Sequence, residues 1–305
     1  MQMQENVLTY VIEDVAGGEF YIDLAESMSI LNRKLHRQQG LWKVDAVCAW
    51  VNVHGQAPLG MPYSIAIGGA PRNWVTRNAL VKAFEFWKEQ QATAYDALGS
   101  DAVKPRWQDF KVYLNENHRT EGSITPTSGH MFGGDQPYDP GEWVYSRIVY
   151  EDVVQGPPTT ITQHEPLLHI LGNNNGTTNV GLIQQYSDSR VQVHSPDPDV
   201  PTNLFNNIYV KAHGDIDAQT EEIVENLMVS NDEPPYDVDN YPGDAANGEE
   251  PLLYAFAANT TTLGRKLVLN GFTAPNGLLE VQVDSSDERN MDIWLQFFVS
   301  GREAY

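Results

Sequence analysis

Alternating apolar and polar residues recur along most of this 305-residue chain, and they constrain its fold more than any single motif does. The clearest case is near the C-terminus, where one side of the pattern is formed by Met291, Ile293, Leu295, Phe297 and Val299. Successive side chains of a strand point to opposite faces, so this spacing predicts a strand with one face in a core. We therefore expect a mostly β protein.

Other segments carry the same spacing. One apolar face is predicted for Trp42, Val44, Ala46, Cys48 and Trp50, and another for Leu279, Val281 and Val283. Shorter predicted strands cover residues 6–12, 19–23, 62–67, 109–114, 143–151, 166–171, 190–194, 206–213, 252–258 and 266–270. Long connectors rich in Gly, Pro, Asn and Asp separate them, as is typical of turns.

Two segments have helical spacing instead. After Pro71, a helix is predicted over about residues 72–92, with a buried stripe of Leu80, Val81, Phe84 and Trp87. A second helix is predicted over about residues 217–229, where Asp217 can cap the start. Residues 24–38 fit either a third helix or an irregular turn.

The two helices lie close to half a chain apart, which favours two similar domains. Gly156, Pro157 and Pro158 interrupt two apolar segments and suggest the boundary. The predicted domains are residues 1–156 and 157–305, each a strand-rich unit with one helix.

Charge limits the possible partners. The net charge of −22 disfavours direct binding to nucleic acid, because phosphate contacts depend on clustered Lys and Arg. Residues 214–250 hold twelve Asp or Glu and no Lys or Arg, which fits a solvated acidic face or a cation-dependent contact. The first basic residue is Arg33, so we expect no secretory signal and synthesis in the host cytoplasm.

Few residues are candidates for catalysis or metal binding, and none of them forms a recognisable catalytic motif. Cys48 is expected to be buried and inert, and the histidines to be isolated, because no His-x-His occurs and His164 and His169 fall on opposite faces of a strand. The segment most similar to a calcium-binding loop contains Asp237, Asp239 and Asp244, but these residues do not have the spacing of EF-hand ligands.

One carboxylate remains as a weak candidate for chemistry. Glu142 beside Trp143 is a pair that a sugar-hydrolysing site could use. A Trp on a strand is more often part of a core, and the pair gives no geometry by itself. We predict no catalytic, cofactor-binding or metal-binding residues, and no cofactor.

The layout resembles a known family, and four short stretches are similar to capsid sequences of small environmental DNA viruses. They are Tyr21 to Leu24, Asn32 to Lys34, Trp107 to Lys111 and Gly141 to Trp143. The family is that of double jelly-roll major capsid proteins of tailless icosahedral viruses, especially small lipid-containing single-stranded DNA bacteriophages of the finnlakevirus type.

The resemblance implies an all-β fold with two short helices, arranged as two jelly-roll β-barrels in tandem. It also implies a structural virion protein that trimerises into pseudo-hexagonal capsomers of an icosahedral shell. Expected partners are copies of the chain, minor capsid or penton proteins, and an internal membrane. The alternative is a carbohydrate-binding or adhesive β-sandwich, such as a viral spike or a lectin-like protein.

Overall fold

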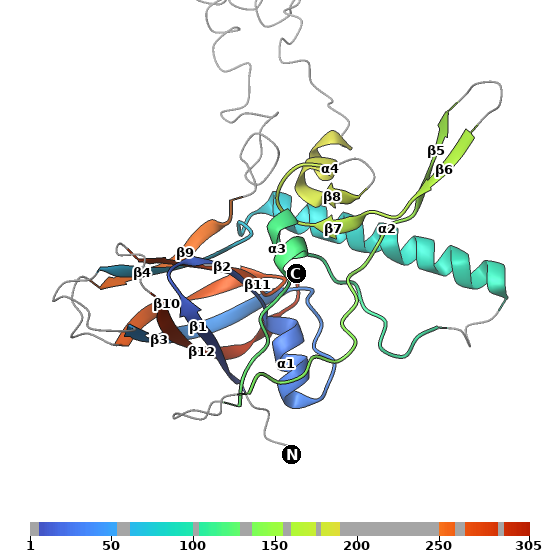
Figure 1. Cartoon of the computed structure of the whole chain (residues 1–305). Helices are drawn as coiled ribbons and strands as arrows, with labels where there is room; N and C mark the ends of the chain where they lie inside the picture. Colours follow the sequence, from blue (N-terminus) through green and yellow to red (C-terminus); the bar gives the residue numbers. More distant parts are fainter. Residues whose placement is uncertain are drawn as a thin grey trace, which may run out of the picture.

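A computed structural model describes residues 6–53, 62–99, 104–128, 136–154, 160–174, 178–189, 250–259, 266–285 and 290–305. Its main body is a sandwich of two four-stranded antiparallel sheets (Figure 1). The first sheet has the order β1 (Val7–Val15), β12 (Met291–Glu303), β3 (Leu41–Val53), β10 (Lys266–Pro275). The second has the order β2 (Gly18–Asp23), β11 (Leu278–Ser285), β4 (Tyr63–Gly69), β9 (Leu252–Asn259).

The strands pair as if the chain had been folded in half. The first strand pairs with the last, β2 with β11, β3 with β10, and β4 with β9, all antiparallel. Four nested pairs divided between two facing sheets give the eight-stranded order of a jelly roll. The described residues therefore contain one jelly roll, built from both ends of the chain.

This topology corrects the predicted domain boundary. Strands from residues 7–69 share both sheets with strands from 252–303, so a division into 1–156 and 157–305 does not separate two barrels among the described residues. The prediction assumed that pairing strands are close in sequence. Here the long segment between β4 and β9 divides the sequence without dividing the sandwich.

Burial in the sandwich follows the predicted alternation closely in two strands. The five apolar residues of β12 and the three of β11 that were expected to share a face are all buried. They pack with residues of both sheets in one core that includes Tyr10, Trp42 and Ile67. Removal of this apolar surface from water is the main force holding the two sheets together.

In β3 the prediction fails halfway along the strand. The register with β12 slips at Asp45, which lies between the partners of Val299 and Phe298. A bulge adds one residue and exchanges the two faces of the strand beyond it. Burial therefore passes from Trp42 and Val44 to Val47, Ala49 and Val51, whereas Ala46, Cys48 and Trp50 are only half-buried.

Helix α1 (Leu24–Asn32) follows β2 directly and resolves the open assignment of residues 24–38. Its start is held by the two-residue turn between β10 and β11, because the Leu24 amide donates to the Gly277 carbonyl at 2.9 Å. Asn276 and Gly277 both have positive φ, at 54° and 69°, as an Asn-Gly hairpin turn requires. The sandwich thus fixes where α1 begins.

The segment between β4 and β9 carries the remaining described elements, around a second apolar core. They are α2 (Trp74–Leu98), α3 (Glu116–Glu121), β5 (Tyr150–Val154), β6 (Thr160–His164), β7 (Leu167–His169), β8 (Asn179–Gly181) and α4 (Leu182–Asp188). Figure 1 shows α2 beside the sandwich and the β5–β6 hairpin projecting from the body. None of the described helices is both long and apolar enough to cross a membrane.

The predicted helix after Pro71 is confirmed as α2. The Asn73 side chain accepts a hydrogen bond from the Thr76 amide at 2.8 Å and caps its start. Leu80 is buried, and Phe84 and Trp87 pack against the second core, as expected. Val81 is exposed instead, because it lies beside the stripe and not on it.

Several predictions fall outside the described residues. They are the strands at 190–194 and 206–213, the helix at 217–229, the acidic loop with Asp237, Asp239 and Asp244, and all of the acidic segment except Glu250. Among the described segments, 109–114 forms only an isolated bridge, from Tyr113 to His169, and the segment 143–151 enters a strand only at Tyr150.

Candidate functional site

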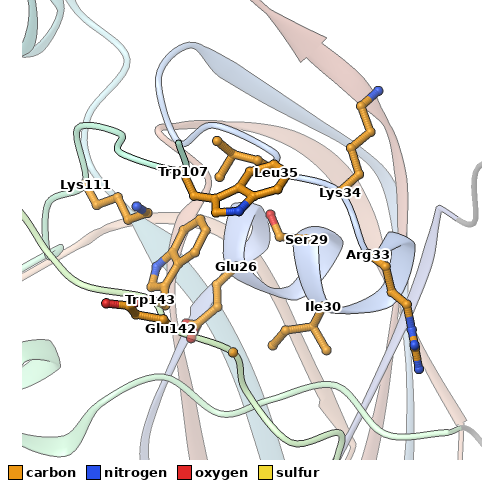
Figure 2. Close-up of a pocket in the computed structure, with 11 residues that line it drawn as sticks. Glu26, Ser29, Ile30, Arg33, Lys34, Leu35, Trp107, Lys111, Glu142 and Trp143 are labelled. Atoms are coloured by element: carbon orange, nitrogen blue, oxygen red, sulfur yellow. The ribbon is translucent and has the colours of Figure 1, made fainter. Parts of the chain in front are cut away.

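A pocket of about 230 Å³ lies where α1 meets two segments of the insertion (Figure 2). One wall is α1 and the turn after it, from Glu26 to Leu35. The other walls are Trp107 and Lys111 from one segment and Gly141 to Trp143 from another. Figure 2 shows both indole rings beside α1, with the side chains of Arg33 and Lys34 extending away from them.

Asp23 is the structural anchor of this pocket. It caps α1, and its Oδ1 accepts from the amides of Ala25 at 2.9 Å and Glu26 at 3.1 Å. Its Oδ2 accepts from Gln38 Nε2 at 2.6 Å, Trp143 Nε1 at 3.1 Å and the Tyr145 hydroxyl at 3.4 Å. A buried carboxylate requires such partners, and these fix the Trp143 ring in the pocket wall.

Burial perturbs the titration of both carboxyl groups at the start of α1. It raises the pKa of Asp23 to about 6, and the hydrogen bonds to its oxygens oppose that rise. It raises the pKa of Glu26 to about 8, and the charge of Asp23 adds to the effect. Burial therefore favours the protonated form of the Glu26 carboxyl, which can donate a hydrogen bond.

Lys111 brings a cation to the same place. Lys111 is only 5% exposed, and its Nζ atom lies 4.6 Å from the centroid of the Trp143 ring. Burial lowers its pKa, whereas the surrounding acids Asp109, Asp23, Glu142 and Glu26 oppose that shift. Contact between an ammonium and an aromatic face is stabilising, more so when water is excluded.

A buried histidine lies behind the pocket but cannot activate a nucleophile. The Leu114 amide donates to His118 Nδ1 at 3.1 Å, so the ring proton belongs on Nε2, which faces Ser123 Oγ at 2.8 Å. Burial lowers the pKa of His118 to about 3, so the ring stays neutral. His118 is thus a donor to Ser123 and not the base that nucleophilic catalysis requires.

The structure brings together residues that the sequence placed far apart. Glu142 and Trp143 both line the pocket, as do residues of three of the four stretches quoted for the resemblance, and the fourth stretch supplies Asp23. Neither Asp23 nor Glu26 was predicted as a site residue from the sequence. The sequence does contain a pattern that marks them, because Asp followed three residues later by Glu is a capping box, which indicates the start of a helix.

The other sequence candidates lie elsewhere. Cys48 is a free, half-buried cysteine on β3, so full burial was wrong. His169 is buried, with Nδ1 near the Leu171 carbonyl and Nε2 near the Asn179 side-chain amide, whereas the His164 ring is tilted against the Tyr150 ring, with the centroids 5.1 Å apart. Within the described part of the chain, no group of three or more His, Cys, Asp or Glu side chains could hold a metal ion.

A second hollow of about 550 Å³ lies between α2, α4 and the base of β5. Its lining is largely apolar and includes Phe86, Ile148 and Leu182. The one ammonium in the lining, Lys82, bonds the Ser189 hydroxyl. The polar side chains of the lining, among them Gln185 and Tyr186, are outweighed by its apolar surface.

Comparison with known proteins adds no relative: no protein-family model, curated protein or solved structure matches this chain.

Proposed function

We propose that this chain is a major capsid protein, a structural subunit of an icosahedral virion shell that associates with copies of itself. The observation that carries the proposal is the set of four nested strand pairs in two facing sheets. Eight-stranded jelly rolls of this order are typical of viral capsid and lectin domains. The four stretches similar to capsid sequences favour the first of these uses.

The described surface also favours association. The edge strand β9 exposes Leu252, Leu253 and Phe256, the last at 58%. An exposed apolar edge strand is a liability in a monomer, because its free backbone groups can pair with another chain. Contact with a second copy would cover both the apolar side chains and this edge.

The proposed assembly differs from the expected capsomer in one respect. Three chains with two barrels each give six similar edges, but the described residues supply one barrel per chain. The double jelly roll and the pseudo-hexagonal trimer remain predictions that depend on a second barrel. Self-association through one barrel does not require it.

Charge shapes the conditions of assembly. Subunits with a net charge of −22 repel one another, and at 0.1 M salt that repulsion is largely screened between charges more than about 10 Å apart. We therefore expect association to strengthen with ionic strength. The same charge keeps the proposed shell from binding a genome directly, which is consistent with a membrane or another protein inside it.

Electron microscopy and light scattering of the purified full chain test this proposal. We expect capsomers or closed shells, or in solution a stable oligomer of 34.1 kDa subunits; a trimer would favour the double jelly-roll prediction. Phe256→Ser should weaken association, whereas Leu98→Ser, at an exposed position near the end of α2, is the matched control. A strict monomer at every protein and salt concentration would contradict the proposal.

A further inference from the structure

The pocket beside α1 contains a buried cationic group, Lys111, that makes no hydrogen bond to the described part of the chain. Among the described residues, Lys111 Nζ has no hydrogen bond or ion pair, although the side chain is almost fully buried and lines the cavity. The Lys111 ammonium therefore faces the cavity, with the Trp143 ring on one side of it. A ligand in the cavity can accept a hydrogen bond from it.

The apolar part of the pocket has a defined shape. Trp107 is 62% exposed and lines the cavity, with the Arg106 guanidinium 5.0 Å from its ring centroid. Trp143 is fixed by its hydrogen bond to Asp23. An exposed indole next to a rigid one offers a flat surface for a ring with an apolar face.

The polar groups of the pocket narrow the ligand class. Lys111 and the protonated Glu26 are donors, and the exposed Glu142 is an acceptor. The ammonium disfavours a cationic ligand, and the acids around it, Asp109, Asp23 and Glu142, disfavour a polyanion such as a nucleotide. A neutral ring carrying several hydroxyl groups satisfies donors and acceptors together.

The volume of the pocket also favours a small ligand. Drug-sized ligands occupy pockets of roughly 300–1,000 Å³. A cavity of about 230 Å³ therefore suits a ligand of one small ring. We propose that the pocket formed by Glu26, Trp107, Lys111, Glu142 and Trp143 binds one neutral sugar unit of a glycan, with the sugar ring against the Trp107 indole.

This proposal is independent of the shell proposal, because a monomer could bind a glycan and a shell could assemble without one. It is also a binding proposal only. The neighbouring His118 donates to Ser123 and therefore does not activate that hydroxyl as a nucleophile.

A glycan array followed by titration of the best neutral saccharide, read by ligand-observed NMR, tests the proposal on the full chain. We expect binding of a neutral glycan, weakened about tenfold by Trp107→Ala. Trp74→Ala is the matched control, because Trp74 is similarly exposed, at 51%, and lies outside the pocket at the start of α2.

Lys111→Met is the second variant, and near-ultraviolet circular dichroism will show whether it is folded. Folded Lys111→Met protein should also bind the glycan more weakly than the wild type. Three results would overturn the proposal: no neutral glycan binds, only charged glycans bind, or Trp107→Ala binds as well as the wild type. Trp107 is at the surface, so that variant tests the site even where Lys111→Met fails to fold.

Discussion

Glu26→Gln should change the pH dependence of stability in a defined direction. Burial raises the pKa of Glu26 from 4.5 to about 8, so the folded state binds the proton more tightly than the unfolded chain. This contribution to stability is complete below about pH 4.5 and is lost as the pH rises through about 8. Wild-type stability should therefore fall across that range.

The size of the effect follows from the same shift. Each pH unit between the two pKa values changes the free energy of unfolding by about 1.4 kcal/mol, so three units, from pH 5 to pH 8, correspond to about 4 kcal/mol. Gln has the same size and does not ionise. The variant should gain about 4 kcal/mol on the wild type between these pH values.

Urea unfolding at several pH values, followed by tryptophan fluorescence, measures the difference. The charge of Asp23 is one cause of the Glu26 shift, so Glu26→Gln also removes the repulsion between the two carboxyl groups, and the measured difference belongs to the pair. Glu85→Gln is the control, because the Glu85 side chain is exposed on α2, and it should follow the wild type at every pH. If Glu26→Gln runs parallel to the wild type across the range, the burial of a protonated Glu26 is refuted.

Three further predictions concern the fold, each measured by urea unfolding. Leu295→Ala should destabilise the protein by about 2–5 kcal/mol, because Leu295 is fully buried in β12. The control Val268→Ala, at an exposed position of β10, should change stability by less than about 0.5 kcal/mol. Equal effects of the two substitutions would contradict the core assignment. Asn73→Ala should cost about 1 kcal/mol through loss of the α2 cap, and an unchanged stability would contradict that role. Gly271→Ala should cost about 1–3 kcal/mol, because the added Cβ would lie 2.3 Å from the carbonyl oxygen of Asp45, and a neutral result would show that the two strands are further apart.

The sequence predicted the strands better than their arrangement. Period-two spacing located β11 and β12, because β11 alternates from Leu279 to Val283 and β12 alternates from Met291 to Val299 with one face buried. In β3 the same rule failed, since the bulge at Asp45 depends on pairing with β12 and leaves no mark in the spacing of β3 itself. Alternation identifies a strand but does not identify its partner.

The domain division failed for the same reason. Val7 and Phe298 are register partners, yet nothing in either segment indicates a partner so distant in the sequence. The division at 156/157 came from local composition, which reports turns and not long-range pairing. A segment inserted between β4 and β9 is indistinguishable by composition from a linker between two domains.

The site was predictable only in pieces. Glu142 beside Trp143 suggested a sugar-binding pair, and both line the pocket. Lys111 was not singled out from the sequence, because its burial arises where the insertion packs on α1. Its role becomes visible only when three segments distant in the sequence are brought together.

The central claim is that both ends of the chain build one barrel, and a cross-strand disulfide tests it most directly. Thr9 on β1 and Gln296 on β12 are register partners, and Cα atoms of antiparallel partners lie about 4.5–5.5 Å apart, within disulfide range. Cys48, the partner of Gln296 on β3, must first be changed to Ala. The control pairs Cys at position 9 with Cys in place of Gln282, on the other sheet.

Mild oxidation and peptide mass spectrometry then give the result. One barrel predicts efficient linkage of Thr9→Cys to Gln296→Cys within a single chain, and none in the control. Two separate barrels, divided between the halves of the sequence, predict no linkage in either protein and would contradict the account.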